Sequence, residues 1–498
     1  MSLEFWLPVL IVLCAFVTAL LIFCVSEEER GLRTVLNLAG AGGTFVLVLI
    51  MLWGVFHERA YETRIPLLPG HDLVLRARAL SVLFSLLSAS LWLVTTIYAI
   101  GYLEDSPNRR RFFGFFGICV SATLGVALAG NLITFLLFYE LLTLATYPLV
   151  VHRGTDIALR AGRIYLAYAL GGGAALLLGA VWLSSLIGPV DFSIDGALRN
   201  FEETHRVQLI IIFVLLIGGL GVKAALVPLH GWLPLAMVAP APVSALLHAV
   251  AVVKSGAFGI VRVVYDVYGA QTAEELSLLT PLAVLAAVTI IYGSVRALYQ
   301  NDLKRRLAYS TVSQVSYIAL GTALIGPVAA IGGIVHLVHQ GLMKITLFFC
   351  AGNLAETLGI HKISELNGVG QRMPVTMAAF TIGALGMIGV PPLAGFISKW
   401  YLGLGAFVSG QYWAIAVLAG SSLLNAAYFL PILHAAWFKA PAGSWPAERH
   451  FGSQETSLLL LVPPVLTALL ALGLGLFANL PFSPLRWAQL VAAREFGQ

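Results

Sequence analysis

Four lysines and one arginine lie inside long apolar stretches of this sequence. These residues are Lys223, Lys254, Arg262, Lys344 and Lys399. A charge at the centre of a membrane span costs at least about 2.5–3.5 kcal/mol, so such a residue usually faces a cavity or a partner. A buried lysine near a carboxylate can take up and release a proton, because desolvation disfavours its charged form and the carboxylate favours it. The lysines therefore predict proton chemistry inside an apolar protein.

A single acid, Glu140, lies in the apolar stretch NLITFLLFYELLTLATYPLV. An acid in such a place is either neutralised by a structural partner or serves as a proton-relay or ion-pair residue. Lys223 is its natural counter-ion, although no spacing rule joins residues of separate helices. We expect Glu140 to pair with Lys223, and the purely structural alternative stays open.

Prolines interrupt the helix that carries Lys223. The sequence GGLGVKAALVPLHGWLP places Pro228 and Pro234 shortly after the lysine, and proline breaks or kinks a helix. A broken helix inside a membrane is tolerated where it is buried in protein or lines a hydrated cavity. His230 and Trp232 lie at this break, where they either gate water or cap and anchor the chain.

Two further stretches place histidines near lysines. Lys254 follows His248 by six residues, a net rotation of about 240° in a regular helix. We therefore expect these two side chains on different faces, with water as the only bridge. In IGGIVHLVHQGLMKITLFF, His336, Gln340 and Lys344 recur every fourth residue and form one polar stripe. Such a stripe is typical of one side of a hydrated path.

A second proline break resembles the first. In IGALGMIGVPPLAGFISKWYLG, Pro391 and Pro392 precede Lys399. Both breaks follow an I-G-x-L-G sequence and lie close to a lysine. Two such segments five helices apart predict two repeats, and repeats with an odd number of spans run in inverted topology. Lys254 and His336 would then join two half-paths in a polar axis along the membrane plane.

The composition excludes a water-soluble protein. Of the 498 residues, 59% are hydrophobic and 11% are charged, against about 25% charged in soluble domains. The four cysteines lie in apolar runs without paired spacing, so neither a disulfide framework nor a thiolate metal site is expected. Basic residues are scattered over short connections, which argues against a nucleic-acid surface. Glycine runs at 40–43 and 171–173 lie inside spans and indicate close helix packing.

Fourteen apolar stretches are long enough to cross a membrane, which predicts an all-α polytopic membrane protein. They lie near residues 3–25, 32–54, 77–101, 112–129, 131–151, 162–186, 208–228, 243–265, 278–297, 307–325, 328–353, 374–402, 411–436 and 456–479. The first lacks a basic n-region and a small-residue cleavage site, so we expect a retained span. Pro-Gly punctuation and partial alternation in 62–80 indicate a short hairpin.

We expect a single membrane domain over residues 1–498, with helices 7 and 12 broken. Its parts are helices 1–3 (1–110), a first repeat of helices 4–8 (111–270), a second repeat of helices 9–13 (275–437), and helix 14 with a tail (455–498). Connections after odd-numbered helices hold about twice as many Lys and Arg as the other connections and the tail, so both termini are expected to face outward. Arg262, near the outer end of helix 8, is expected to snorkel.

Several motifs in fixed order resemble one family. The sequences VPLHGWLPLAMVAPAPVSALLHA, VVKSG, NDLKRRLAYSTVSQVSY, HLVHQGLMKITLFFCAGN and GVPPLAGFISKW closely resemble the antiporter-like subunits shared by respiratory complex I, membrane-bound hydrogenases and Mrp-type multisubunit Na+/H+ antiporters. The resemblance covers nearly all of residues 75–435. It implies fourteen helices in a fold with two inverted five-helix repeats.

The resemblance also implies roles for individual residues. The family's helix 5 glutamate matches Glu140, and its lysines of helices 7, 8 and 12 match Lys223, Lys254 and Lys399. In the family, the glutamate is taken to modulate the pKa of the helix 7 lysine. Protons then pass laterally to the helix 12 residue and an exit. These roles are implied by the family and not by the spacing of the residues.

One position departs from the family pattern. Many members carry His-x-x-x-His in helix 11, whereas this chain has His336 followed by Gln340, with His339 one residue earlier. Glutamine can order water but cannot carry a proton charge, which puts a histidine relay through this position in doubt. His336 and Lys344 still match.

The sequence thus predicts a proton-translocating subunit of a multisubunit cation/proton antiporter, with no catalytic site of its own. The expected translocating residues are Glu140, Lys223, Lys254, Lys344 and Lys399, with His248 and His336 as supporting relays, and the candidates for gating are His230, Trp232, Pro228, Pro391 and Pro392. We expect no cofactor or metal in this chain and no nucleic-acid partner. Its partners would be other integral membrane subunits in a bacterial-type inner membrane, and its substrates protons and monovalent cations.

The D-type subunits of the Mrp antiporters are the best match within the family. The tract GIHKISELNGVGQRMP, the length near 500 residues and lysine at position 399 favour them. A proton-pumping subunit of a complex I-like or membrane-bound hydrogenase complex stays open as the alternative, and any redox chemistry would then belong to its partners.

Two other classes of protein share parts of this pattern. A membrane cytochrome would bind haem through His248, His336, His339 or His434, but bis-histidine sites need facing pairs on adjacent helices, and two of these lie on one helix. A stand-alone transporter also has inverted repeats and broken helices. It would be expected to show several mid-span carboxylates, whereas Glu140 is the one clear example.

Overall fold

The computed structural model describes residues 3–104, 106–198, 205–441 and 455–496. Within this part of the chain, 12 helices are long and apolar enough to cross a membrane. They confirm the predicted helical, multi-pass membrane protein. Arg199 and Arg449, two of the basic residues on which the expected orientation rests, lie outside the described residues.

The bounds of these helices follow the predicted spans closely. They are α1 (Leu3–Cys24), α2 (Arg30–Phe56), α3 (Ala79–Tyr102), α4 (Arg109–Leu128), α5 (Leu132–Val150), α6 (Asp156–Ile187), α7 (Arg206–Lys223), the helical stretch Ala241–Tyr268, α12 (Leu279–Leu298), α14 (Pro327–Leu358), α18 (Tyr412–Phe438) and α19 (Leu458–Leu476). The shorter elements include α11 (Ala270–Glu275), η5 (Ile363–Glu365), α15 (Val369–Arg372) and α20 (Pro484–Glu495).

The two other expected spans are also helical. The stretch expected near 307–325 is α13 (Leu303–Ala323), which carries many Ser, Thr and Gln residues and is therefore less apolar than its neighbours. The stretch near 374–402 is divided into α16 (Pro374–Ile388) and α17 (Ala394–Val408), each too short to cross a bilayer alone. The count of fourteen crossings stays a prediction.

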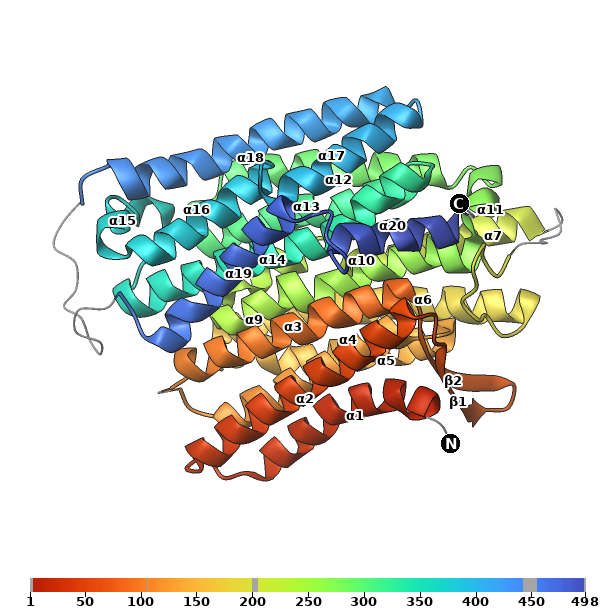
Figure 1. Cartoon of the computed structure of the whole chain (residues 1–498), viewed down its shortest axis with the longest axis horizontal. Coiled ribbons are helices and arrows are strands. Elements are labelled where there is room, and N and C mark those ends of the chain that lie inside the picture. The colour runs from red at the N-terminus through yellow and green to blue at the C-terminus, as the bar shows by residue number, and fades with distance from the viewer. Residues whose placement is uncertain (1–2, 105, 199–204, 442–454, 497–498) are drawn as a thin grey trace.

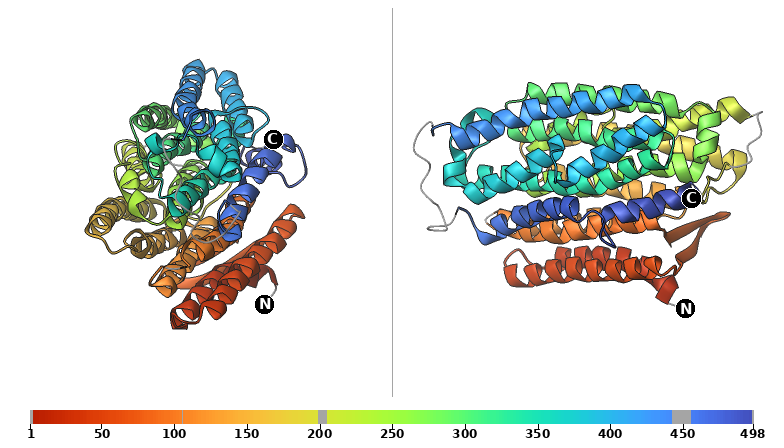
Figure 2. Two further views of the ribbon diagram at one scale, coloured as in Figure 1. Left: turned by 90° about the vertical axis from the view of Figure 1, so that its left-hand side faces the viewer. Right: turned by 45° about the horizontal axis from the view of Figure 1, so that its top comes forward.

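Most helices run along one common direction, and α1 begins at the same end of the bundle at which α20 ends (Figure 1). From the start of α1 to the end of α20, the chain must therefore run along the bundle an even number of times. In Figure 2, α1 and α2 form an outer layer beside the main bundle. Helix α14 lies at the centre, where α3, α13, α16, α17, α19 and α20 pack against it.

A β-hairpin lies between α2 and α3, at the end of the bundle where α1 begins (Figure 1). Strands β1 (Tyr61–Leu68) and β2 (His71–Ala77) pair antiparallel, with Tyr61 opposite Ala77. Gly70 in the turn has a φ of 78°, a backbone conformation that glycine adopts at no steric cost. The hairpin predicted over 62–80 is therefore confirmed.

Both predicted helix breaks are present. Helix α7 ends at Lys223, and helical structure resumes in α8 (Trp232–Leu235) and η2 (Ala236–Val238). Helix α16 ends at Ile388, and α17 begins at Ala394. Each break contains a cis proline, at Val227–Pro228 and at Pro391–Pro392.

The helical stretch Ala241–Tyr268 is irregular. It consists of α9 (Ala241–Ala245), the π-helical turn η3 (Leu246–Val250), α10 (Val252–Arg262) and the π-helical turn η4 (Val263–Tyr268). Ala251 separates η3 from α10 with a φ of −107° and a ψ of −83°. Turns of π-helix are rare and occur frequently at functional sites.

Candidate functional site

Lys223 is the last residue of α7, and its ammonium group lies against α5. Its Nζ donates a hydrogen bond to the backbone carbonyl of Tyr139 and lies 3.3 Å from the centroid of the Tyr139 ring. A cation over an aromatic face is stabilised by the ring quadrupole, and more strongly where water is excluded. Lys223 is 1% exposed. The α7 lysine therefore contacts the residue that precedes Glu140.

The carboxylate of Glu140 packs against α6. A Cβ added to Gly173 would lie 2.7 Å from Cδ of Glu140, so only glycine leaves room for the carboxylate there. Oε1 of Glu140 has no hydrogen-bond partner among the described residues. The adjacent Gly172 lets α6 approach α7, because a Cβ there would lie 3.0 Å from the carbonyl oxygen of Gly219. The glycine run thus serves close packing, as predicted, and also accommodates the acid.

Trp232, on the far side of the first helix break, forms a hydrogen bond back to α7. Its Nε1 donates a 2.7 Å hydrogen bond to the carbonyl of Val222 in the last turn of α7, which also accepts from the backbone N–H of Ala225 at 3.2 Å. The indole is buried beside Tyr165, with 5.2 Å between ring centroids. His230 packs edge-to-face against Tyr292 at 4.9 Å. These contacts support capping by Trp232, while gating at both breaks stays a prediction.

Lys254 and His248 both contact α14. Nζ of Lys254 donates a 2.7 Å hydrogen bond to the carbonyl of Leu337, and the His248 ring stacks on Phe348 at 4.5 Å. The expectation that they lie on different faces was wrong, because it assumed a regular helix. His248 lies in the π-helical turn η3, and Ala251 separates this turn from α10, which carries Lys254. On the other side of α10, a Cβ added to Gly256 would lie 2.8 Å from the carbonyl carbon of Lys223.

Lys399 caps the helix that precedes it. Its Nζ donates to the carbonyls of Met387 (2.9 Å) and Ile388 (2.8 Å) and to Oγ of Ser422 (3.0 Å). The last carbonyls of a helix lack intrahelical partners and carry a negative partial charge, which favours a cation. The second break therefore provides the acceptors that hold its lysine.

His336 connects α14 to the segment that carries Lys399. Its Nδ1 lies 2.8 Å from Oγ of Ser398. The ring of Tyr317 lies 5.1 Å from the His336 ring, and Nζ of Lys399 lies 5.5 Å from the Tyr317 centroid. His336 and Lys399 therefore share Tyr317 as a neighbour.

Lys344 is fully buried and turns toward α13. Its Nζ donates to Oγ of Ser310 at 2.6 Å and to the carbonyl of Leu307 at 3.2 Å. Nearby, both polar side-chain atoms of His339 and of Gln340 have no hydrogen-bond partner among the described residues. Buried polar groups without a protein partner are normally satisfied by ordered water. This part of α14 is thus suited to a hydrated path.

The predicted site residues therefore lie on helices that pack against one another across the bundle. We call Lys223, Lys254, Lys344 and Lys399 the lysine row. Helix α14 is the common element, since it carries Lys344 and accepts the hydrogen bond from Lys254. Lys254 and Lys344 lie near the middle of their helical stretches, so this part of the row is at mid-depth of the bundle.

Sequence reasoning missed several neutral residues that complete these contacts. They are Tyr139, Ser310, Tyr317, Asn425 and Tyr428. Asn425 and Tyr428 lie three residues apart inside the apolar α18, which places them on one helix face. The argument that singled out charged residues in apolar stretches would have found Asn425 and Tyr428 if it had included uncharged polar side chains.

Arg262 does not snorkel, contrary to the expectation. Its side chain is 3% exposed and forms a 2.8 Å ion pair with Asp266, four residues later. It also donates to the carbonyl of Ala129 and lies over the ring of Phe192. A buried acid one turn away offers a closer partner than the membrane surface, and the i, i+4 spacing was visible in the sequence.

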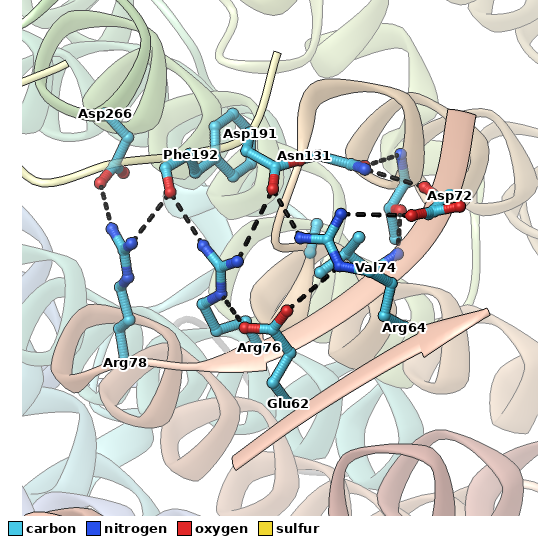
Figure 3. Close-up of polar contacts among 12 residues, drawn as sticks. Glu62, Arg64, Asp72, Val74, Arg76, Arg78, Asn131, Asp191, Phe192 and Asp266 are labelled. Atoms are coloured by element: carbon cyan, nitrogen blue, oxygen red, sulfur yellow. Dashed lines mark hydrogen bonds and ion pairs between the residues drawn. The ribbon is translucent and has the colours of Figure 1, made fainter. Parts of the chain in front are cut away.

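Asp266, the partner of Arg262, also belongs to a larger network of charges that attaches the hairpin to the bundle. Figure 3 shows this network from Asp266 and Arg78 to Arg64 and Asp72. Arg78 reaches Asp266 at 3.5 Å, Arg76 pairs with Glu62 at 2.6 Å, and Arg64 pairs with Asp191 at 2.6 Å. The hydrogen bond from Arg76 lowers the pKa of Glu62 against the opposing effect of burial. This network lies apart from the lysine row.

The helical bundle, the two proline breaks and the lysine row define a polytopic membrane protein built to hold charge in its interior. Residues 129–425 match the family described as "NADH:quinone oxidoreductase/Mrp antiporter, TM". The chain belongs to this family. The match covers both breaks and all four lysines of the row.

Relatives of this chain have been described in several bacteria. It is 37% identical over 389 residues to the N subunit of the NADH-quinone oxidoreductase of Desulforudis audaxviator, covering 77% of each chain. It is 28% identical over 478 residues to the D-type subunit of the Na(+)/H(+) antiporter of Bacillus subtilis, covering 94% of this chain and 93% of the relative. Some relatives are longer, and the chain covers 53% of hydrogenase-4 component B of Escherichia coli.

Solved structures share the fold. A chain of the Mrp complex from Dietzia sp. DQ12-45-1b aligns with a TM-score of 0.88 at 22% identity, over 100% of this chain and 98% of that chain. Because the sequence identity is 22%, this similarity shows a shared fold.

Proposed function

We propose that this chain is the proton-translocating subunit of a multisubunit cation/proton antiporter. The observation that carries the proposal is the lysine row, in which Lys223, Lys254 and Lys344 are buried, Lys399 is half-buried, and each lysine lies at a helix break, on α14 or against it. Membership of the family and the nearly full-length match to the D-type subunit of a Na(+)/H(+) antiporter support it. The proposed partners are other integral membrane subunits, and the proposed substrates are protons and a monovalent cation.

The proposed path runs from the Glu140–Lys223 region through Lys254 and α14 to Lys399. Each ammonium group along it is held by carbonyl or hydroxyl acceptors, which can release it when a neighbouring charge arrives. Like charges interact strongly in a medium of low dielectric. A proton that arrives at one lysine therefore favours release from the next.

The arrangement in the membrane is part of the proposal. We place the chain in a bacterial-type plasma membrane with both ends outward, because the basic connections favour the opposite face. The segments 111–270 and 275–437 would form two inverted repeats, each with one proline break. His248 and His336 would assist transfer near α14, and the breaks, with His230, Pro228, Pro391 and Pro392, would control hydration.

The alternative is a proton-pumping subunit of a complex I-like or hydrogenase complex. The 37% identity to the N subunit of an NADH-quinone oxidoreductase favours it. Purification from the native membrane in mild detergent, with identification of the accompanying chains and an iron spectrum, separates the two. Small hydrophobic subunits without iron support the antiporter, and iron–sulfur or nickel-containing subunits support the alternative.

Transport by the intact complex tests the shared part of the proposal. Inside-out vesicles that contain the chain with its native partners should accumulate protons under respiration and release them when Na+ or K+ is added, as followed by a pH-sensitive dye. Vesicles lacking only this chain are the control. The proposed function would be excluded if both preparations responded equally and if no redox-active complex that contains the chain pumped protons.

A further inference from the structure

Hydrogen bonds connect Lys344 to helix α18. Nζ of Lys344 donates to Oγ of Ser310 at 2.6 Å, and this hydroxyl lies 2.8 Å from the hydroxyl of Tyr428. The Tyr428 hydroxyl in turn donates to Oδ1 of Asn425 at 2.5 Å. All four residues are fully buried. The contacts therefore form a continuous chain from α14 through α13 to α18.

The same chain continues to Lys399. Nδ2 of Asn425 donates a 3.1 Å hydrogen bond to the carbonyl of Met387. This carbonyl also accepts the 2.9 Å hydrogen bond from Nζ of Lys399. Met387 thus lies at the junction between the side chain of Asn425 and the ammonium group of the second helix break.

Each hydrogen bond in the chain has a defined direction. Asn425 donates through Nδ2 to a carbonyl, so its Oδ1 can only accept, and the Tyr428 hydroxyl must be the donor. With that proton committed, Tyr428 accepts from Ser310. Ser310 in turn accepts from Lys344, whose charged ammonium group has donors but no acceptor. This order is the one that a protonated Lys344 requires.

Loss of the proton from Lys344 would reverse this order. A neutral amine has a lone pair, so the Ser310 hydroxyl can turn and donate to it. The Tyr428 hydroxyl can then donate to Ser310, and Oδ1 of Asn425 no longer accepts a hydrogen bond from Tyr428. The hydrogen bond from Asn425 to the Met387 carbonyl would then weaken. That carbonyl would become more available to accept from Lys399.

We propose that Ser310, Tyr428 and Asn425 form a relay, here called the α18 relay, that couples the protonation of Lys344 to that of Lys399. An amide accepts a hydrogen bond but does not readily pass on a proton, so the relay transmits hydroxyl orientation and not the proton itself. The three residues position the lysines. The inference rests on the proposed proton translocation by the lysine row.

Tyr428→Phe tests the relay, because it removes the hydroxyl and keeps the ring. In vesicles with the native partner subunits, we expect cation-induced proton movement to slow about tenfold, the size of one lost hydrogen bond to a buried polar group. The dependence of the rate on pH should also become steeper, because in the wild-type protein protonation of one lysine opposes protonation of the other and spreads their titration over a wider pH range. A purely structural change would leave that steepness unaltered.

Tyr98→Phe is the matched control. Tyr98 is fully buried and its hydroxyl donates to the carbonyl of Phe349 at 3.0 Å, outside the relay. Its variant should transport with the wild-type steepness in pH. Wild-type rate and steepness in Tyr428→Phe would overturn the relay, whereas absence of transport by the wild-type protein would overturn the proposed function instead.

A double variant provides a second test that does not depend on one substitution. Ser310→Ala and Tyr428→Phe break the same chain, so the double variant should be no slower than the slower single variant. Ser310→Ala combined with Tyr98→Phe should give the product of the single effects. Multiplicative effects in the Ser310–Tyr428 pair would show that the two residues act independently and would contradict the relay.

Discussion

Each lysine of the row donates a hydrogen bond to a backbone carbonyl. The acceptors belong to Tyr139 for Lys223, Leu337 for Lys254, Leu307 for Lys344 and Met387 for Lys399. A carbonyl stabilises an ammonium group but binds it less strongly than a buried carboxylate would. This choice of partner suits the proposed uptake and release of protons by these lysines.

Replacement of Lys223 tests its place in the path. Lys223→Ala should reduce cation-induced proton movement to background while the complex still assembles, because no neighbouring group can replace the ammonium over Tyr139. Lys439→Ala, at an exposed lysine that follows α18, should transport normally. Transport in inside-out vesicles and subunit content by mass spectrometry are the measurements, and wild-type rates in assembled Lys223→Ala would remove Lys223 from the path.

Glu140 can be tested without changing its own side chain. Gly173→Ala would place a methyl group against the carboxylate, so Glu140 must move and transport should fall about tenfold or more, as expected for a displaced functional group. Gly171→Ala is the matched control, because nothing lies within 4 Å of a Cβ at that position of α6. Equal transport by the two variants, measured in the same vesicles, would show that the position of the carboxylate is unimportant.

At the level of elements, the second helix break positions Lys399. Gly389 ends α16 with a φ of 96°, and an added Cβ would lie 2.8 Å from Cδ of Lys399. Gly389→Ala should therefore cost about 1 kcal/mol of stability from its backbone conformation and also reduce transport. Gly410→Ala has a similar backbone cost at a φ of 72° but meets no atom within 4 Å. Thermal unfolding and transport rates should separate the two effects, and comparable transport in both variants would contradict the prediction.

The short helix α20 carries a carboxyl group that should make its attachment sensitive to pH. Burial, and then the nearby Asp266, raise the pKa of Glu495 to about 8, although Arg262 and Arg78 act in the opposite direction. The folded protein then holds a proton that the unfolded chain releases near pH 4.5. Stability from this group is therefore present at low pH and is lost as the pH rises toward about 8.

Hydrogen exchange checks this prediction for α20. Exchange in Pro484–Glu495, corrected for intrinsic rates, should accelerate between about pH 5 and pH 8 and then level off. Glu495→Gln should remove most of that dependence, because the amide does not titrate. The neighbouring α19 serves as an internal control. A flat profile for α20 in the wild-type protein would contradict the raised pKa.

For the whole molecule, the sequence predicted the course of the chain better than its contacts. Apolar runs and proline pairs mark the helices and both breaks, because these depend on nearby residues. The partners of Lys344 and Lys399 lie on other helices, at positions that no spacing rule reaches. His248 and Lys254 show a further limit, since the π-helical turn that contains His248 and the irregular backbone at Ala251 depart from regular helix geometry. Arg262 was misplaced because the prediction left out its acid neighbour, one turn away.

The depth of the lysine row has an electrical consequence. Lys254 and Lys344 lie near the middle of their helical stretches, so a charge moving between them travels mainly along the membrane and crosses little of the transmembrane voltage. Moving one charge fully across 100 mV changes its energy by about 2.3 kcal/mol. That work would fall on the steps that connect the row to either surface. A change in membrane voltage should therefore act on entry and exit while leaving lateral transfer nearly unaffected.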